Sequence, residues 1–360
     1  MNNDFKRQLA EYKDRIDADI AVYAQHVRKT SREQYGEQGY LIADAFLDLL
    51  DRGGKRLRGA LVIAGYEMCG GTDRDMIVRA ATALEMIHAY ILIIDDIQDR
   101  SSMRRGLPTV HEKLAAYHQQ QGLDGDSGHA GVSLALNAAL MGSSAAHMLF
   151  AGLHVDTELK NKVLGILNHT IMMTVYGQTY DILNEMTHQV TVDTIKRTME
   201  LKTANYTVLN PLCIGMVLAG AGCEDTDAIR DYAIQTGLTF QITDDILGIF
   251  GTDEQTGKSV KDDIREGKQT LLTAYAQEYA SPHDQATLRA ALGNSGISEE
   301  ELLACQTILR DSGALDFALS QADKHVQLAL SALEHPPEHW NNQQIAFLRQ
   351  LVLSLKARKQ

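Results

Sequence analysis

The chain has 360 residues, of which 44% are hydrophobic and 22% charged, and this ordinary globular composition allows a large buried core. A formal net charge of −13 argues against nucleic acid or an anionic membrane surface as the partner. None of the five prolines lies in a linker rich in Pro, Gly and Ser, so we expect one domain over residues 1–360, although the length alone would also allow two.

The cysteines and the apolar segments indicate the cellular location of the protein. Its four cysteines are far apart and have no metal-binding spacing, so we expect reduced thiols in the cytoplasm. The first fifteen residues are charged and lack the apolar stretch of a signal peptide. The longest nearly apolar run, residues 213–223, is too short to span a bilayer, so we expect no membrane span.

Helical periodicity dominates the pattern. Ala, Leu, Met, Glu and Gln are abundant and alternating β-branched stretches are scarce, which predicts an all-α fold. Glycines predict breaks at residues 53–54, 70–73, 122–131 and 251–267. The expected helices, in chain order, are 4–27, 41–50, 55–69, 74–100, 109–117, 133–153, 157–185, 192–221, 227–250, 268–279, 299–312, 314–333 and 341–356.

The expected helix at residues 74–100 is unusual because it lacks Pro and Gly and is apolar on every side at 91–94. Such a helix is normally buried among others. Yet it leads directly into Asp95, Asp96 and Asp99, which share an arc of roughly 100° on a helix. Carboxylates at this spacing repel one another, so a cation is expected between them, and oxygen-only ligands suit Mg²⁺. The alternative is a solvated helix end that carries acids by chance.

The expected helix at residues 227–250 repeats this pattern. Gln241, Asp244 and Asp245 lie on one face of it, at positions i, i+3 and i+4. Two acidic sites, each at the end of an apolar helix, are harder to explain as surface decoration than one. Together they predict two carboxylate walls that face one polyanion through shared metal ions.

Basic residues near these clusters are candidates for binding that anion. Helix N-termini bind anions well, and Arg suits bidentate phosphate contacts. Each cation alone could be a solvated surface charge, but a position beside two acidic clusters in an acidic protein favours binding. The candidates are Lys55, Arg56 and Arg58 at a helix start, Arg104 and Arg105 after the first acidic cluster, and Lys202, Lys258 and Lys268.

Three further polar residues could belong either to the binding site or to the core. His88 lies two turns before Asp95 in an apolar segment, where a histidine is more often a satisfied core residue than a ligand. Gln178 and Asp181 share the helix at 157–185 and could be one more polar pair in the core.

Taken together, these segments resemble the trans-isoprenyl diphosphate (polyprenyl) synthase family, in particular its short-chain geranylgeranyl and farnesyl diphosphate synthases. DDxxD alone would be moderate support, but the ordered set, which spans residues 53–272 in the family's order and spacing, is highly specific. It comprises GGKRLR at 53–58, DDIQDRSSMRRG at 95–106, GQTYD at 177–181, Lys202-Thr203, FQITDD at 240–245 and the lid-like GKSVKDDIREGKQT at 257–270.

The resemblance implies an isoprenoid-synthase helical bundle around a deep central cavity, and a homodimer. It assigns Mg²⁺ to Asp95, Asp96, Asp99 and Asp244, with Asp245 in support and three ions expected when substrate is bound. It assigns the allylic diphosphate (dimethylallyl, geranyl or farnesyl) to Arg104, Lys202 and Lys258. It assigns isopentenyl diphosphate to Lys55, Arg58, His88 and Arg105, and leaves Arg56 between binding and structure.

The implied reaction is prenyl transfer. Metals and cations stabilise the departing pyrophosphate, so the allylic C–O bond ionises. Gln241, Thr203 and the Lys202 backbone then offer oxygen dipoles to the allylic cation. The isopentenyl double bond attacks and a proton leaves to the released pyrophosphate. Helix walls and a loop at 251–267 would keep water away from the cation.

Three places depart from the family's pattern. Gly248 stands where many members carry the last Asp of a second DDxxD. Gly142-Ser143 replaces a usual Gly-Asp pair, which puts a secondary structural contact in doubt. The segment at 117–131 is longer than the usual connection.

Product length is expected to depend on side chains below the first acidic cluster. That cluster carries no insertion and follows Tyr90 and Ile91, which resembles enzymes that make the C20 product, with C15 as the second possibility. A terpene cyclase of the same fold is the nearest alternative, but it would have no use for Lys55, Arg58 and Arg105. A catalytically silent partner subunit is another, but it would be expected to lose an acidic motif.

Overall fold

The computed structural model describes residues 3–187, 190–252 and 262–357, and its fold is all-α, as expected. Within these residues the strands are two antiparallel pairs of residues that form one small hairpin, β1 (Met103–Arg104) and β2 (Leu107–Pro108). The first helices are α1 (Asn3–Asp51), α2 (Leu57–Met68), α3 (Arg74–Gln98), α4 (Val110–Gln120), α5 (Ser127–Ala151) and α6 (Thr157–Thr187).

The second half of the chain contains the remaining helices. They are α7 (Val192–Met199), the π-helix η1 (Glu200–Leu209), α8 (Asn210–Leu218), α9 (Cys223–Ala228), α10 (Arg230–Phe250), α12 (Asp262–Arg265), α13 (Leu271–Tyr279), α14 (Pro282–Ala291), α15 (Glu299–Asp311), α16 (Ala314–Ala332) and α17 (Asn342–Lys356).

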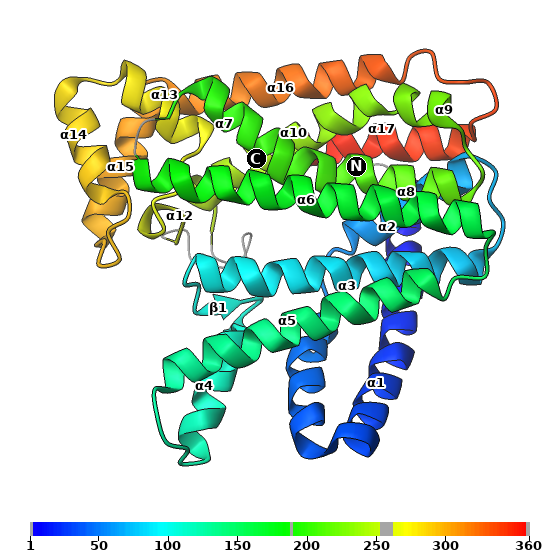
Figure 1. Cartoon of the computed structure of the whole chain (residues 1–360). Coiled ribbons are helices and arrows are strands. Elements are labelled where there is room, and N and C mark those ends of the chain that lie inside the picture. Colours follow the sequence, from blue (N-terminus) through cyan, green and yellow to red (C-terminus); the bar gives the residue numbers. More distant parts are fainter. Residues whose placement is uncertain (1–2, 188–189, 253–261, 358–360) are drawn as a thin grey trace.

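Most expected helices are present, and the differences have local causes. The expected segments 4–27 and 41–50 are the two arms of α1, which kinks at Gly36 (φ 69°, ψ −162°) and folds back on itself at the bottom of Figure 1. The expected break at 122–131 is shorter, because Asp126 accepts hydrogen bonds from the backbone N–H groups of Gly128 and His129 and starts α5. Helix α14 was not expected. It begins with a Ser281 cap followed by proline.

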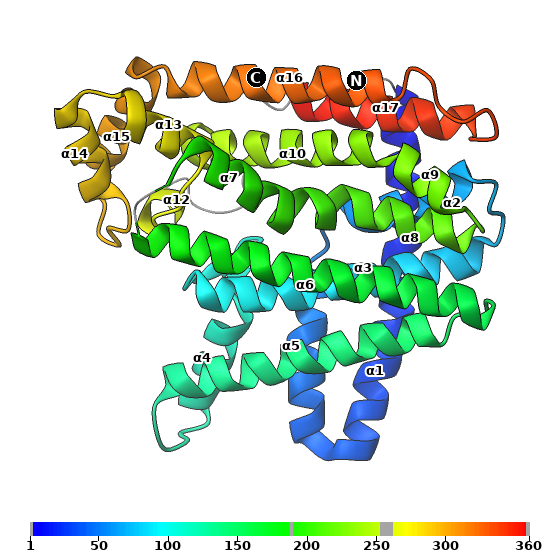
Figure 2. The same cartoon turned by 45° about the horizontal axis from the view of Figure 1, so that its top comes forward.

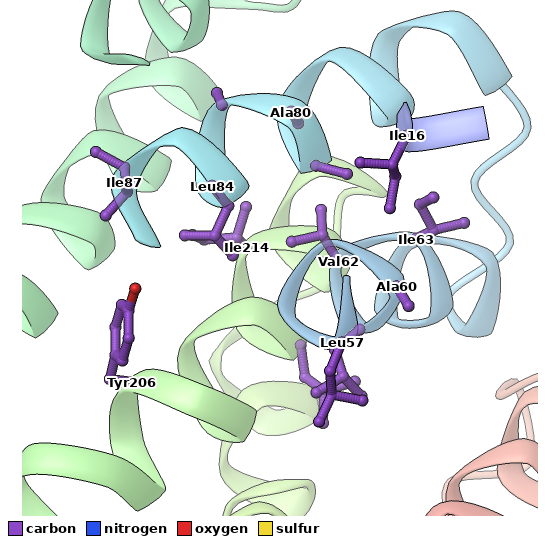
Figure 3. Close-up of a cluster of buried hydrophobic side chains, with 14 of the residues drawn as sticks. Ile16, Leu57, Ala60, Val62, Ile63, Ala80, Leu84, Ile87, Tyr206 and Ile214 are labelled. Carbon is purple, nitrogen blue, oxygen red and sulfur yellow. The ribbon is translucent and has the colours of Figure 1, made fainter. Parts of the chain in front are cut away.

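The core consists of two hydrophobic clusters. The larger one joins α1, α2, α3, α5, α8 and α17, and Figure 3 shows Leu84 of α3, Ile214 of α8 and Val62 of α2 pointing into it. The smaller one joins α7, α10 and α12–α16. Ile234 of α10 packs against both clusters, so α10 connects the two parts. Figures 1 and 2 show α6, α10 and η1 running roughly parallel across the molecule, with α3 beneath α6.

By length and composition alone, α3 and α5 could each cross a membrane. The apolar stretch of α3 is 72% buried inside the molecule, as in the core helix of a globular protein, whereas that of α5 is only 33% buried. Helix α5 therefore presents an apolar face to the outside.

Candidate active site

A cavity of about 450 Å³ lies between α2, α3, α6, η1 and α10, a size typical of small-molecule sites. It collects most of the residues that the sequence singled out. Its lining includes Arg58, His88, Tyr90, Ile91, Asp95, Arg104, Arg105, Lys202, Thr203, Gln241 and Asp244.

The first acidic cluster lies at the end of α3. Asp96 is buried, and its Oδ1 accepts a hydrogen bond from Arg104 Nε at 2.5 Å, while Arg104 Nη2 lies 3.4 Å from Asp95 Oδ2. Burial raises the pKa of Asp96 to about 6, although Arg104 opposes the shift. Burial likewise raises the pKa of Asp99 to about 6, against the charge of Lys268. These carboxylates are therefore costly to ionise unless cations face them.

Two lysines face the acids. Lys202 Nζ lies 2.6 Å from Asp181 Oδ2 and 3.6 Å from Asp95 Oδ1. Burial disfavours the lysine charge, but these two carboxylates raise the pKa of Lys202. Lys268 Nζ lies 3.4 Å from Asp99 Oδ2 and 3.0 Å from Glu266 Oε2. Asp181, which the sequence left open as a core residue, is therefore part of the charged wall.

The donor set fits a divalent metal that is shared with a ligand. Among the described residues, Asp96 Oδ2 is buried without a hydrogen-bond partner, and Asp95 and Asp244 line one cavity from α3 and α10. In the part of the chain that the structure describes, no three acidic, His or Cys side chains converge closely enough to hold an ion by themselves. Mg²⁺ typically uses one or two carboxylates together with water and substrate phosphates, which suits this arrangement.

On α10, hydrogen bonds fix the second acidic cluster. Gln241 Nε2 donates to Asp245 Oδ1 at 2.7 Å, and Gln241 Oε1 accepts from Thr203 Oγ1 at 2.6 Å. Burial raises the pKa of Asp245 to about 7, although the Gln241 hydrogen bond lowers it. The orientation of the Gln241 amide is thus set by groups on both sides.

Arg58 and His88, which the sequence assigned to isopentenyl diphosphate, lie next to each other in the cavity. Arg58 Nη1 lies 3.1 Å from His88 Nε2, Nη2 donates to Thr207 Oγ1 at 2.8 Å, and the guanidinium lies 4.6 Å from the centre of the Tyr206 ring. Burial and the Arg58 charge lower the pKa of His88, so its imidazole is neutral near pH 7. His88 therefore contacts the cavity and a charged partner.

The remaining cations predicted to bind diphosphate are Arg105, Lys55 and Lys258. Arg105 Nη1 donates to the carbonyls of Leu49 and Gly53, and burial lowers the pKa of Arg105 to about 10. Lys55 is exposed on the segment before α2 and is not part of the cavity lining, and Lys258 lies outside the described residues.

Arg56 has a structural position. It is 4% exposed, and its Nε donates to Asp17 Oδ1 at 2.7 Å while its Nη1 lies 3.6 Å from Glu85 Oε2. It thus links α1 to α3, which supports the structural role of the two that the sequence left open.

Lys202 and Thr203 lie on the π-helix η1, inside what the sequence predicted as one regular helix. A Cβ on Gly177 of α6 would lie 2.5 Å from Lys202 N, and a Cβ on Gly237 of α10 would lie 2.8 Å from Ala204 Cβ. Both helices therefore touch the η1 backbone through glycines. Irregular turns of this kind often mark functional sites.

Tyr90 and Ile91 line the cavity below the acidic cluster. The Tyr90 hydroxyl is within hydrogen-bond reach of Ser143 on α5, and Gly142 packs directly against the Phe46 ring. Of the Gly142-Ser143 pair, which departs from the family's pattern, Ser143 thus contacts this wall, whereas Gly142 packs against α1.

Sequence reasoning missed several site residues. Tyr206 and Thr207 line the cavity and contact Arg58, yet an aromatic at helical spacing is usually core. Glu266, which pairs with Lys268, follows the glycine-rich segment and had no assigned partner. The lid-like motif was the one signal that could have identified Glu266.

Known proteins resemble this chain over most of its length. A sequence profile of the family described as Polyprenyl synthetase matches residues 40–309. The geranylgeranyl diphosphate synthase of Saccharolobus solfataricus is 32% identical over 82% of this chain and 84% of that protein. The geranylfarnesyl diphosphate synthase of Aeropyrum pernix is 34% identical over 82% and 88%, respectively.

The solved structures include a similar protein with bound ligands. The geranylgeranyl pyrophosphate synthase of Corynebacterium glutamicum, complexed with isoprenyl diphosphate and magnesium, superposes with a TM-score of 0.89. It is 28% identical, and the match covers 98% of this chain and 99% of that one. The profile match and the identity to curated relatives show that this chain belongs to the polyprenyl synthetase family.

Proposed function

We propose that this chain is a trans-prenyltransferase that condenses an allylic diphosphate with isopentenyl diphosphate, giving a short-chain all-trans prenyl diphosphate and pyrophosphate. One observation carries the proposal. Asp95 of the first acidic cluster and Asp244 of the second line one cavity of about 450 Å³, together with the cations Arg104, Lys202 and Lys268, and this cavity continues into apolar side chains such as Ile91 and Ile171. The charged part suits diphosphates and the apolar part suits a hydrocarbon chain. The relatives described above are synthases, so the cyclase and silent-subunit alternatives gain no support.

Mg²⁺ is the cation that suits the oxygen donors. Asp95, Asp96 and Asp99 on α3 and Asp244 on α10 would hold it from two sides of the cavity. When bound, the metal neutralises charge that develops on the pyrophosphate leaving group. The Corynebacterium glutamicum relative binds magnesium together with isoprenyl diphosphate, which supports this assignment. We infer three ions with substrate bound, the number that the family resemblance implies.

Arg104 and Lys202 would bind the allylic diphosphate, and Lys258 joins them by resemblance. As the allylic C–O bond breaks, positive charge develops on the prenyl carbon. The oxygens of Thr203, Gln241 and the Lys202 backbone would stabilise that charge by their dipoles. The hydrogen bonds from Thr203 to Gln241 and from Gln241 to Asp245 support this role, because the dipoles need no reorientation during the reaction.

Isopentenyl diphosphate would bind at Arg58, His88 and Arg105, with Lys55 at the outer edge. Neutral His88 can donate one hydrogen bond to a phosphate oxygen, and Arg58 supplies the charge. The isopentenyl double bond then attacks the allylic carbon, and the proton that it loses passes to the released pyrophosphate.

The main product is proposed to be C20, with C15 as the second possibility. Tyr90 is buried at the apolar wall, beside Ile91, and is supported by Ser143. A close-packed wall cannot admit further methylene groups without strain, so chain growth would stop there.

The exposed apolar face of α5 and α6 supports a homodimer. These helices lie at the front of the molecule in Figures 1 and 2. Apolar side chains gather on them, and exposed apolar patches of this kind commonly form interfaces. They are Leu136, Leu140, Met148, Met172, Val175, Tyr176, Tyr180, Leu183 and Met186.

Two further proposals concern the whole chain. Residues 1–360 would form one domain, because Ile234 packs against both hydrophobic clusters. The four cysteines are free, which supports a reducing, cytoplasmic location.

The test is to incubate the protein with Mg²⁺, labelled isopentenyl diphosphate and each of dimethylallyl, geranyl and farnesyl diphosphate, and then to measure product length. The proposal requires labelled geranylgeranyl diphosphate as the main product. Chains mainly well beyond C20 would reject the product length, and the absence of any labelled prenyl product would reject the function.

A further inference from the structure

Arg52, the first residue after α1, joins the end of that helix to the hairpin formed by β1 and β2. Its Nη1 donates to the carbonyl of Pro108 at 2.8 Å and lies 3.3 Å from the carbonyl oxygen of Arg104. These two carbonyls belong to different strands of the hairpin. The Arg52 side chain is 5% exposed, so its guanidinium is enclosed by protein and is not a solvated surface charge. Arg52 is not part of the cavity lining, so any effect on substrates must pass through the hairpin.

Asp48, one turn earlier on α1, fixes the orientation of this guanidinium. Its Oδ2 accepts hydrogen bonds from Arg52 Nη2 at 2.7 Å and from Arg52 Nε at 3.2 Å. The same oxygen lies 3.2 Å from Lys113 Nζ of α4, the helix that follows the hairpin. Because the guanidinium is planar and rigid, these bonds direct its remaining nitrogen, Nη1, toward the hairpin carbonyls.

A second arginine makes the same kind of contact in the opposite direction. Arg105 belongs to the hairpin, and its Nη1 donates to the carbonyls of Leu49 and Gly53 at the end of α1. A Cβ on Gly54 would lie 3.0 Å from Arg105 Nη2, so a glycine at this position leaves room for the guanidinium. The end of α1 and the hairpin are therefore joined from both sides by arginines that bond backbone carbonyls.

The turn of the hairpin is strained and needs such support. Its two loop residues, Arg105 and Gly106, have φ values of 55° and 73°. Hairpin turns with two positive φ values normally carry Asn, Asp or Gly first, because a larger side chain is strained in the left-handed region. A residue other than glycine keeps this backbone only where its surroundings hold it. Arg52 bonds the chain on both sides of the turn, at Arg104 and Pro108, and is thus placed to hold it.

We propose that Arg52, oriented by Asp48, is a positioning residue that fixes the hairpin and thereby places the Arg105 guanidinium for isopentenyl diphosphate. Arg104, the arginine of the same hairpin that is proposed for the allylic diphosphate, depends on Arg52 less, because its own side chain is hydrogen-bonded to Asp96. This inference rests on the proposed function, which assigns isopentenyl diphosphate to Arg105.

The test compares Arg52→Met with the wild type by steady-state kinetics and by amide hydrogen exchange of residues 101–109, measured by mass spectrometry. Arg52→Met should raise the KM for isopentenyl diphosphate by roughly tenfold, because misplacing a binding group by about 1 Å can cost as much as a hundredfold. The KM for farnesyl diphosphate should change little, and the hairpin amides should exchange faster. A mere loss of folded protein would lower kcat and leave both KM values unchanged.

The control is Arg349→Met. Arg349 also donates to a backbone carbonyl, that of Leu333, but it joins α17 to the end of α16. Its removal should leave both KM values and the exchange of the hairpin amides unchanged.

Asp48→Ala separates positioning from the loss of a positive charge. Arg52→Met removes a cation, which by charge alone weakens the binding of an anion. Asp48→Ala removes an anion and by charge alone should strengthen that binding. The inference predicts the opposite sign for Asp48→Ala, namely a raised KM for isopentenyl diphosphate and faster exchange of the hairpin amides. It also predicts that the double variant resembles Arg52→Met, because both substitutions release the same contact.

A wild-type KM for isopentenyl diphosphate in Arg52→Met would overturn the inference, and so would an equal rise of both KM values. A KM at or below that of the wild type in Asp48→Ala would also do so, and this variant decides alone if Arg52→Met does not fold. Failure of the proposed function is distinguishable, because the wild type would then make no prenyl product. The exchange of the hairpin amides would still show whether Arg52 and Asp48 fix the hairpin, and unchanged exchange in both variants would refute that.

Discussion

Arg58 is the residue whose surroundings best separate the two substrates. It is held by Thr207, His88 and the Tyr206 ring. Replacing it with Ala should raise the KM for isopentenyl diphosphate by roughly tenfold to a hundredfold, since a hydrogen bond to a charged group contributes about 1.5–3 kcal/mol. The KM for the allylic substrate should change little.

Steady-state kinetics, with the concentrations of both substrates varied, measures the two KM values. The control is Arg230→Ala, an exposed arginine on α10 that should leave both constants unchanged. Equal increases of both KM values in Arg58→Ala would contradict the assignment of separate sites.

Tyr90 is expected to limit chain growth. Tyr90→Ala removes the buried ring from the apolar wall and should shift products beyond C20 with little loss of rate. Tyr90→Phe keeps the ring and loses only the contact with Ser143, so its products should keep their length. Chromatography measures the length of the products. An unchanged length distribution in Tyr90→Ala would exclude Tyr90 as the residue that limits chain growth.

The sequence predicted that the two acidic clusters face one site, because carboxylates that follow an apolar helix have few structural explanations, and Asp95 and Asp244 do line one cavity. It could not predict the contact of Arg52 with the hairpin, since that contact depends on where the chain returns to the end of α1. The sequence could not identify Tyr206 as a cavity residue either, because aromatic residues of the hydrophobic core occur at the same helical spacing.

At the scale of elements, the π-helix η1 positions Lys202 and Thr203 between α6 and α10. Gly237→Ala would place a Cβ against the η1 backbone, so we expect a loss of stability of about 1–3 kcal/mol, typical of overpacking, together with a lower rate. Gly165→Ala is the matched control. It lies exposed on α6 with open space around its Cβ and should be neutral or stabilising.

Denaturant unfolding and the rate at saturating substrates measure both effects. If Gly237→Ala matched the wild type in stability and in rate, the close contact would have no functional role.

The helix pattern was largely predictable because amphipathic periodicity identifies long helices. The π-helix was not, because its hydrophobic pattern is continuous with α7 and α8. The kink in α1 depends on the backbone of a single glycine, Gly36, and the start of α5 depends on the Asp126 cap.

At the scale of the whole molecule, the α5 and α6 face should join two copies of the chain. Leu140 and Met148 on α5 are 69% and 74% exposed. Replacing both with Asp should convert a dimer into a folded monomer, because charges are depleted at interface cores. Leu303→Asp, at a 60% exposed leucine on α15, is the control and should remain dimeric. Sedimentation equilibrium measures the mass, and a monomeric wild type would reject the interface.

The central claim is that two acidic walls act through divalent metal on diphosphates in one cavity. The most direct measurement follows incorporation of labelled isopentenyl diphosphate with farnesyl diphosphate, in Mg²⁺ and in excess EDTA, for the wild type, Asp95→Ala and Asp244→Ala. The account predicts incorporation only by the wild type with Mg²⁺, and rates lower by several orders of magnitude in both variants, with unchanged helical circular dichroism. Turnover that persists in excess EDTA, or full activity in either variant, would contradict it.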